Sequence, residues 1–135
     1  MLEQSFLEKL KTAPAASFHV LDAVKAARMN AKTLYIPAPE DVAKAIAAIP
    51  LGQTRTIVEL RRELAIQGNA ETACPAKTIK YWKWLAAAST ELSGSNSAYV
   101  IPWWRVLKDG KPSRHMPGGI EGQIARLREE GVKLQ

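Results

Sequence analysis

Apolar residues between positions 41 and 50 recur at the spacing of an α-helix. Val42, Ile46 and Ile49 follow an i, i+4, i+7 pattern, which places their side chains on one face of a helix. Pro50 lacks the N–H that would continue the helix, so we expect the helix to end there. A turn over residues 51–55 then leads to the next element.

The next helix has a sequence signal at its N-terminus. Thr56 and Glu59 match the S/T-x-x-E capping box, in which each side chain accepts a hydrogen bond from the backbone of the other residue. This pattern predicts a helix that continues to about Ile66. Its expected apolar side is Val58, Leu60 and Leu64, and its expected solvent side is Arg61 and Arg62.

Two further helices are indicated toward the C-terminus. Pro75 suits the first turn of a helix that we expect over about residues 76–88, after a loop over residues 67–75. The last helix has apolar residues at i, i+4 and i+7, followed by a glycine that suits its C-terminal end: Ile120, Ile124, Leu127 and Gly131.

The first 38 residues predict a different kind of segment. We expect a short helix over about residues 3–11, a helix or mixed segment over residues 17–30, and a short strand or extended arm over residues 33–37. We therefore divide the chain into an N-terminal extension, residues 1–38, and one domain, residues 39–135.

The segment over residues 98–114 predicts extended chain on both sides of an Asp109-Gly110 turn, which is typical of a β hairpin. Two helices joined by a turn and followed by a β wing describe a winged helix-turn-helix. We therefore expect a mainly α fold with a small β hairpin, as in a winged helix-turn-helix-like DNA-binding domain, plus the N-terminal extension.

Charge is unevenly distributed along the chain. Residues 1–50 hold six Lys/Arg and five Asp/Glu, whereas residues 51–135 hold thirteen and eight, so most of the net charge of +6 belongs to the second part. A basic domain suggests a polyanion partner such as nucleic acid, although many soluble proteins are mildly basic without one. No stretch has the apolar length of a membrane helix and the N-terminus does not resemble a signal peptide, so we expect a cytoplasmic, nucleoid-associated protein.

The predicted helix over residues 76–88 has a basic and aromatic side. Lys77, Lys80, Tyr81 and Trp84 fall within an arc of about 100° of a helix, opposite an apolar side. Lysines neutralise phosphates and aromatic rings stack on bases, so this arc is a candidate DNA-reading surface. The alternative is an ordinary amphipathic helix with solvated lysines and half-buried rings.

Candidate catalytic and metal-binding residues are few. Cys74 is the single cysteine, which excludes an internal disulfide and a cysteine-rich zinc site. His19 and His115 lie far from it in the sequence, so an enzyme that uses Cys74 as nucleophile is the least favoured hypothesis, and a structural cysteine is the commoner case. We predict no catalytic residue, no metal and no cofactor, since no phosphate loop, zinc-protease motif or paired-carboxylate signature is present.

Two segments together resemble a known family. Residues 42–60, VAKAIAAIPLGQTRTIVEL, and residues 101–132, with IPWWRVLKDGK, PGGIEGQIARLREEGV, resemble the DNA-binding domain of alkylguanine-DNA alkyltransferases, over about residues 39–134. The repair enzymes have Pro-Cys-His-Arg, with the cysteine as alkyl acceptor, where this chain has Pro102-Trp103-Trp104-Arg105. The chain looks closest to the alkyltransferase-like proteins, which have tryptophan in place of that cysteine.

The resemblance implies a function without catalysis. Alkyltransferase-like proteins bind alkylated guanine in DNA, transfer no alkyl group and hand the lesion to nucleotide excision repair proteins. By this resemblance Trp103, Trp104 and Arg105 form the lesion pocket. The predicted contacts to double-stranded DNA are Thr56, Lys77, Lys80, Tyr81, Trp84, Arg105, Lys108, Lys111 and Arg114.

The chain departs from the family at three positions. Trp104 replaces the usual histidine or glutamine, Ile57 follows Thr56 where the family has a base-pushing tyrosine, and Ile79 falls near the position of an intercalating arginine. The last two departures favour an alternative function, a winged-helix module that binds duplex DNA or a protein partner without flipping a base, whereas the Pro-Trp-Trp-Arg element favours lesion binding.

The tandem tryptophans also allow two interpretations. A flipped base needs flat apolar walls, which tryptophan provides. Trp103 and Trp104 could equally fill the core beneath the hairpin. In a strand, two consecutive side chains point to opposite faces, so one ring could be core while the other lines the site.

Overall fold

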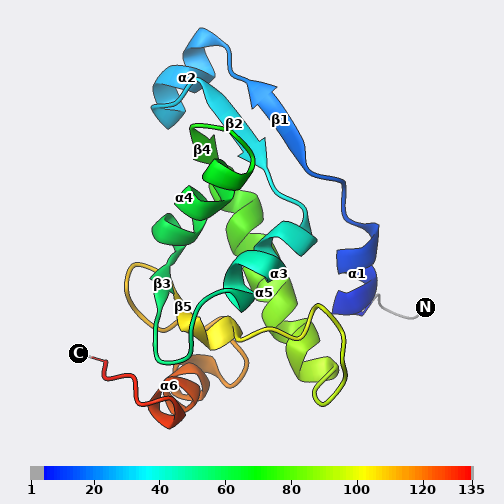
Figure 1. Cartoon of the computed structure of the whole chain (residues 1–135), viewed down its shortest axis with the longest axis vertical. Helices are drawn as coiled ribbons and strands as arrows, with labels where there is room; N and C mark the ends of the chain where they lie inside the picture. The colour runs from blue at the N-terminus through cyan, green and yellow to red at the C-terminus, as the bar shows by residue number, and fades with distance from the viewer. Residues whose placement is uncertain (1–4, 135) are drawn as a thin grey trace.

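The computed structural model describes residues 5–134 and is built around one long central helix, α5 (Pro75–Glu91). Helices α1 (Phe6–Thr12), α3 (Pro39–Ala47) and α4 (Ile57–Gln67) all pack on it (Figure 1). Their apolar side chains form one core around Trp82, Leu85 and Leu60, each fully buried. A small sheet lies at one end of this helical layer, and α6 (Gly119–Glu129) lies at the other.

The N-terminal segment contains the mixed elements that its sequence predicts. After α1 come strand β1 (Ser17–Val20), helix α2 (Ala23–Met29) and strand β2 (Thr33–Ile36). The prediction of a helix over residues 3–11 is confirmed from Phe6 onward, and its first residues lie outside the part of the chain that the structure describes.

Strand β2 joins the N-terminal segment to the rest of the chain. It pairs antiparallel with β1 on one side and parallel with β4 (Thr72–Ala73) on the other, where the sequence predicts only a loop. The Tyr35 ring covers Gly68, so closely that a Cβ on Gly68 would lie 2.3 Å from the ring. Residues 1–38 are therefore an extension in sequence only, because the sheet and this contact cross the boundary at residue 38.

The predicted helices over residues 41–50 and 56–66 are confirmed as α3 and α4. The capping box of α4 is also formed: Glu59 N donates to Thr56 Oγ1 over 3.1 Å and Thr56 N donates to Glu59 Oε1 over 3.0 Å. The predicted sides of α4 are partly wrong. Val58 is 57% exposed and Ile57 is buried instead, because the helix begins at Ile57 and turns this residue toward the core. Arg61 is not a solvent residue, since its Nε donates to the Ala73 carbonyl of β4 over 3.0 Å.

The predicted β hairpin is reduced to its turn. Asp109 and Gly110 adopt positive φ angles of 53° and 73°, as in the type I′ turns that favour Asp-Gly, and Lys108 and Lys111 bridge across them. The return strand does not continue, since Pro112 has no N–H to pair. Strand β5 (Val106–Leu107) pairs instead in parallel with β3 (Arg55–Thr56), so the predicted hairpin is confined to this turn and the winged helix-turn-helix stays a prediction.

The last predicted helix is confirmed as α6, but its buried side differs from the prediction. Ile120 is 46% exposed, whereas Gln123 and Leu127 are fully buried. The short 3-10 helix η1 (Trp103–Arg105) precedes β5 and packs against both α5 and α6. Within residues 5–134 no helix is both long and apolar enough to span a membrane.

Candidate nucleic-acid interface

The exposed and half-exposed residues of one side of α5 follow each other at helical spacing. Ala76 and Lys80 are exposed, and Lys83 and Ala87 follow at helical spacing and are half-exposed. We call these four residues the free face of α5. Tyr81, Trp82 and Leu85 point away from it into the core. The free face therefore combines two small residues with two lysines.

The side of α5 that the sequence predicts to read DNA is turned by about 80° from this free face. Tyr81 is 1% exposed, so its predicted role in DNA contact is wrong. Trp84 is half-buried and packs against the core, and Lys9 of α1 lies over its ring at 5.8 Å. The reason is α1, which covers this flank of the helix. Of the four predicted residues, Lys77 is half-exposed over the Tyr81 ring, and Lys80 is the one on the free face.

Lys83 of the free face lies near Lys108, Arg114 and His115. Lys83 lowers the pKa of the His115 imidazole below its usual value, with smaller contributions from partial desolvation, Arg114 and Lys108. Lys83, Arg114 and Lys108 are therefore close enough to His115 to disfavour its protonated form. We call Lys83, Lys108, Arg114 and His115 the basic cluster. Lys83, Lys108 and Arg114 carry the positive charge of this cluster, since the lowered pKa favours the neutral form of His115, and their shared charge sign produces a positive potential that attracts phosphate.

Two of the other predicted DNA contacts lie on the surface. Lys111 is exposed on the turn next to the basic cluster. Thr56 is half-exposed, and although its Oγ1 already accepts the capping hydrogen bond from Glu59 N, the hydroxyl proton can still be donated.

Arg105, a predicted phosphate contact, has a guanidinium group that is already paired within the protein. It forms a two-pronged ion pair with Glu130, with N–O distances of 2.7 and 2.9 Å, and donates to the Ile49 carbonyl over 2.8 Å. The two side chains are only 13% and 11% exposed. Hydrogen bonds from Arg105 lower the pKa of the Glu130 carboxyl group. Trp104 adds to this effect although its Nε1–H does not reach hydrogen-bond geometry. Arg105 thus fastens η1 to the end of α6.

The three residues predicted to form the lesion pocket do line one cavity. Its volume is about 450 Å³, and Trp103, Trp104 and Arg105 form one wall. The remaining lining combines hydroxyl groups from the C-terminal half of α5 and the loop that follows, apolar side chains, and one further cation: Ala47, Ser89, Thr90, Ser93, Val100, Ile101, Pro102 and Arg126.

The two tryptophans differ in what they expose. They do not form a strand but a 3-10 turn, and their rings meet edge to face at 5.4 Å and 86°. Trp103 is 3% exposed and belongs to the core, and its carbonyl accepts a hydrogen bond from Trp82 Nε1 over 3.0 Å. Trp104 is half-exposed, and the Arg126 guanidinium lies 4.8 Å from its ring centroid. Trp104 is therefore the ring that a ligand in the cavity can reach.

Two buried polar residues hold this site in place, and the sequence did not identify either. Gln123 Nε2 donates to the carbonyls of Trp104 and Val106, and its Oε1 accepts from Ser113 N. Ser89 Oγ donates to the Tyr99 carbonyl and accepts from Ile101 N. A polar residue on the buried side of a helix was the available signal in both cases, since such residues are almost always hydrogen-bonded.

The geometry around Cys74 does not resemble a nucleophile site. Cys74 lies at the N-cap of α5, and its backbone N–H donates to the Tyr35 carbonyl of β2. His19 is hydrogen-bonded to Ser17, and His115 belongs to the basic cluster. Across residues 5–134, no group of three or more His, Cys, Asp or Glu side chains is placed to hold a metal ion.

Comparisons with known proteins give a likeness to solved structures. No family model and no curated protein matches the sequence. Among solved structures, 70% of this chain aligns with 76% of the chain of S. pombe Atl1 in complex with damaged DNA containing O6-carboxymethylguanine. The sequence identity is 24% and the TM-score is 0.47.

Proposed function

We propose that this protein is a non-enzymatic DNA-binding protein of the alkyltransferase-like type, which recognises alkylated guanine in double-stranded DNA. One observation is central to the proposal: the free face of α5 and the basic cluster lie next to each other, and a tryptophan-lined cavity adjoins them. The sequence resemblance over residues 39–134 supports the same function independently of this geometry.

The surface next to α5 suits a duplex. Small residues at Ala76 and Ala87 let a helix approach a groove, and Lys80 and Lys83 lie on the same face. The basic cluster and Lys111 would contact the phosphates on one side of this groove. Such contacts give affinity and orientation but no sequence preference.

The cavity next to the duplex surface and the tryptophan-lined cavity share one lining residue. A hollow of about 300 Å³ lies between the free face of α5 and residues 115–117, and Thr90 lines both this hollow and the tryptophan-lined cavity. A guanine flipped from the duplex would pass Lys83 and reach Trp104. There it would stack on the indole in place of Arg126, and the serine and threonine hydroxyls would face its polar edge.

The proposed activity is binding alone, without transfer of the alkyl group. Trp103 replaces the acceptor cysteine and is buried in the core, and Cys74 lies at the opposite end of α5 from Ser89 and Thr90, which line the cavity. We therefore expect no alkyl transfer. DNA with a radiolabelled methylguanine should leave no label on the protein, and stoichiometric label on Cys74 would contradict the proposal. As the resemblance implies, the bound lesion would be passed to nucleotide excision repair proteins in the cytoplasm, at the nucleoid.

The decisive test compares two duplexes that differ by one alkyl group. We expect tighter binding to the duplex with one alkylguanine, by about ten- to a hundredfold, or about 1.4–2.8 kcal/mol, because an alkylated guanine pairs more weakly and therefore costs less to flip out of the stack. Fluorescence anisotropy with both duplexes at the same salt concentration gives this ratio. Equal affinities would leave only non-specific duplex binding.

The second candidate function is duplex or protein binding without base flipping. Ile57, at the position of the family's base-pushing tyrosine, is 6% exposed and cannot push a base out of the stack. Equal affinity for the two duplexes, together with a steep salt dependence, would favour this candidate.

A further inference from the structure

Strand β1 is an edge strand with one side open. The order of the sheet is β1-β2-β4, so β1 is hydrogen-bonded on one side only, and three of its four residues are exposed. Native edge strands are usually protected by charged side chains, proline or a bulge. The sequence of β1, Ser-Phe-His-Val, contains no proline and no lysine, arginine or carboxylate. Its register with β2 is continuous from Ser17 to Val20, so β1 has no bulge either.

The register shows which backbone groups of β1 are free. Leu21 N donates to the Lys32 carbonyl over 2.8 Å, which continues the antiparallel register in which Val20 is opposite Thr33. Hydrogen-bonded and non-hydrogen-bonded pairs alternate in such a ladder. The pair of His19 with Leu34 is therefore hydrogen-bonded, and the N–H and C=O groups of Phe18 and Val20 point outward, away from β2. A further strand could pair with these four groups without breaking any existing hydrogen bond.

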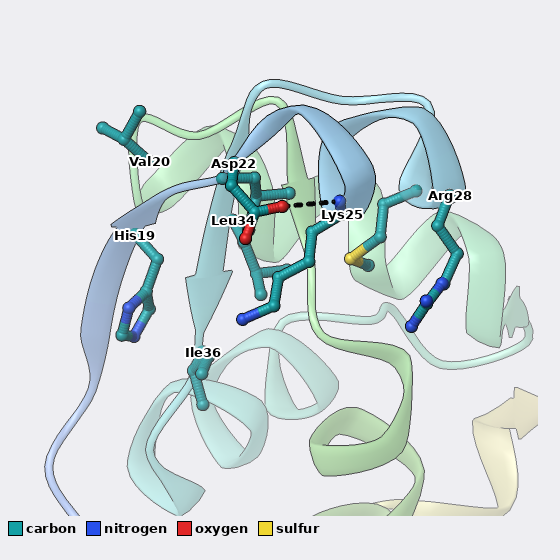
Figure 2. Close-up of a pocket in the computed structure, with 9 residues that line it drawn as sticks. His19, Val20, Asp22, Lys25, Arg28, Leu34 and Ile36 are labelled. Carbon is teal, nitrogen blue, oxygen red and sulfur yellow. Dashed lines mark hydrogen bonds between the residues drawn. The ribbon is translucent and has the colours of Figure 1, made fainter.

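A basic hollow adjoins the same strand. It has a volume of about 510 Å³ and lies between β1, α2 and β2, with Leu34 and Ile36 at its floor (Figure 2). The side chains of Lys25 and Arg28 extend from α2 over this hollow (Figure 2). Phe18 and Val20 alternate with His19 along the strand and are 50% and 78% exposed, and Val20 also borders the hollow.

The charges of the hollow favour an acidic ligand. Within residues 5–134, the ion pairs are Arg55–Glu63 and Arg105–Glu130, so neither Lys25 nor Arg28 is neutralised by one. The one carboxylate in the lining, Asp22, accepts a hydrogen bond from Lys25 N as the N-cap of α2. The lining of the hollow thus contains two cations, Lys25 and Arg28, and one anion, Asp22. It lies beside a strand edge whose four free backbone groups can form hydrogen bonds with a further strand.

We propose that β1 is a docking edge for an extended, acidic segment of a partner protein, which adds to the sheet as a fourth strand. Its backbone pairs with Phe18 and Val20, its carboxylates on one face meet Lys25 and Arg28, and its apolar side chains on the other face cover Phe18 and Val20. A second copy of this chain fits less well. Pairing of two copies of β1 would bring two sets of Lys25 and Arg28 to one interface, and like charges that meet across an interface oppose binding.

The test uses a defined peptide with the proposed chemistry. An acetylated peptide of alternating valine and glutamate is titrated into the isotope-labelled full chain, and amide chemical shifts are followed by NMR. We expect the largest shifts at the amides of Phe18 and Val20. The same peptide with lysine in place of glutamate should bind at least tenfold more weakly.

Substitutions then separate backbone pairing from charge. Val20→Pro removes one outward N–H that the fold does not use, so it should weaken peptide binding about fivefold with little change in the melting temperature, given about 1 kcal/mol per hydrogen bond. Val20→Thr keeps this N–H and should retain binding. Lys25→Glu with Arg28→Glu should reverse the preference for the acidic peptide, whereas Lys11→Glu with Lys44→Glu, two exposed lysines outside the hollow, should not.

Three results would overturn the proposal. The first is an absence of shifts at β1 with the acidic peptide at about 1 mM, a concentration that detects binding of only about 4 kcal/mol. The second is equal binding of the acidic and lysine peptides. The third is that duplex DNA, and not the peptide, shifts the Phe18 and Val20 amides, which would make this edge part of a nucleic-acid surface.

Discussion

Trp103 and Trp104 are adjacent in the sequence but have different surroundings. The 3-10 turn that contains them directs Trp103 into the core and leaves Trp104 half-exposed beside Arg126. The resemblance assigned both rings to the lesion pocket, and the sequence left open that one of them is core instead. It could not assign the two rings, because that depends on the turn and on the hydrogen bonds of Gln123 and Ser89, which are distant in sequence.

Substitution of Trp103 should reduce stability more than it affects lesion preference. Trp103→Ala would leave a cavity in the core, so we expect the free energy of unfolding to fall by about 3–5 kcal/mol, measured by urea denaturation. Trp104→Ala serves as the matched control, with a smaller stability loss and a larger loss of preference for the alkylguanine duplex. A stable Trp103→Ala protein that has lost this preference would show that Trp103 is the pocket wall.

The ion pair between Arg105 and Glu130 should make the free energy of unfolding fall at acidic pH. The pKa of Glu130 is lowered in the folded state, so the stabilisation is complete above the unfolded pKa of about 4.3 and is lost as the pH falls through the lower folded value. Glu130→Gln should cost about 3 kcal/mol at pH 7, because it leaves Arg105 buried without a counter-ion.

The effect of the Arg105–Glu130 ion pair is measured as the free energy of unfolding of the wild type and of Glu130→Gln at several acidic pH values. The difference between wild type and Glu130→Gln should shrink as the pH is lowered from about 5 to 3. Glu129→Gln removes the same charge from an exposed neighbour and should show little of this difference. A constant difference across the range would mean that the ion pair does not account for the effect.

At the scale of the elements, helix α5 shows what a local pattern can predict. Pro75 and the apolar spacing identify the helix correctly, but the face that it presents to solvent depends on α1, which packs over the flank that contains Trp84. This contact joins residues about 75 positions apart in sequence, such as Lys9 and Trp84, and no local pattern encodes it. For a similar reason the predicted wing was too long, because β5 pairs with the distant β3 instead of with its own return strand.

The free face of α5 should dominate the salt dependence of DNA binding. If about four cations contact phosphates, the slope of log K against log salt should be near −3 to −4 on a plain duplex. Lys80→Ala with Lys83→Ala should reduce this slope by about 1–2 units. Lys44→Ala with Lys133→Ala, which removes equal charge from exposed residues elsewhere, is the control. An unchanged slope in the first variant would place the binding surface elsewhere.

At the scale of the whole molecule, the N-terminal extension and the helical domain share one sheet. Strand β2 pairs with β4, and the ring of Tyr35 fills the space above Gly68. The sequence indicated both the strand and a composition break near residue 38. It did not indicate that a loop after α4 would supply the partner strand, because two-residue strands such as β4 have no periodic pattern.

This junction can be tested with two substitutions. Gly68→Ala would place a methyl group against the Tyr35 ring, so we expect a stability loss of about 1–3 kcal/mol. In a Tyr35→Ala background the same substitution should cost much less, and the coupling energy of this double-mutant cycle should exceed 0.5 kcal/mol. Additive effects would contradict the close contact between the two residues.

The most direct test of DNA-lesion recognition is to map the protein surface that changes when DNA binds. Isotope-labelled protein is titrated with a duplex that contains one alkylguanine and, separately, with the plain duplex, and amide and indole N–H shifts are compared by NMR. We predict that both duplexes shift Ala76, Lys80, Lys83 and residues 108–116, and that only the alkylguanine duplex shifts the Trp104 indole N–H. Shifts confined to other surfaces, or identical shifts of Trp104 with both duplexes, would contradict the account.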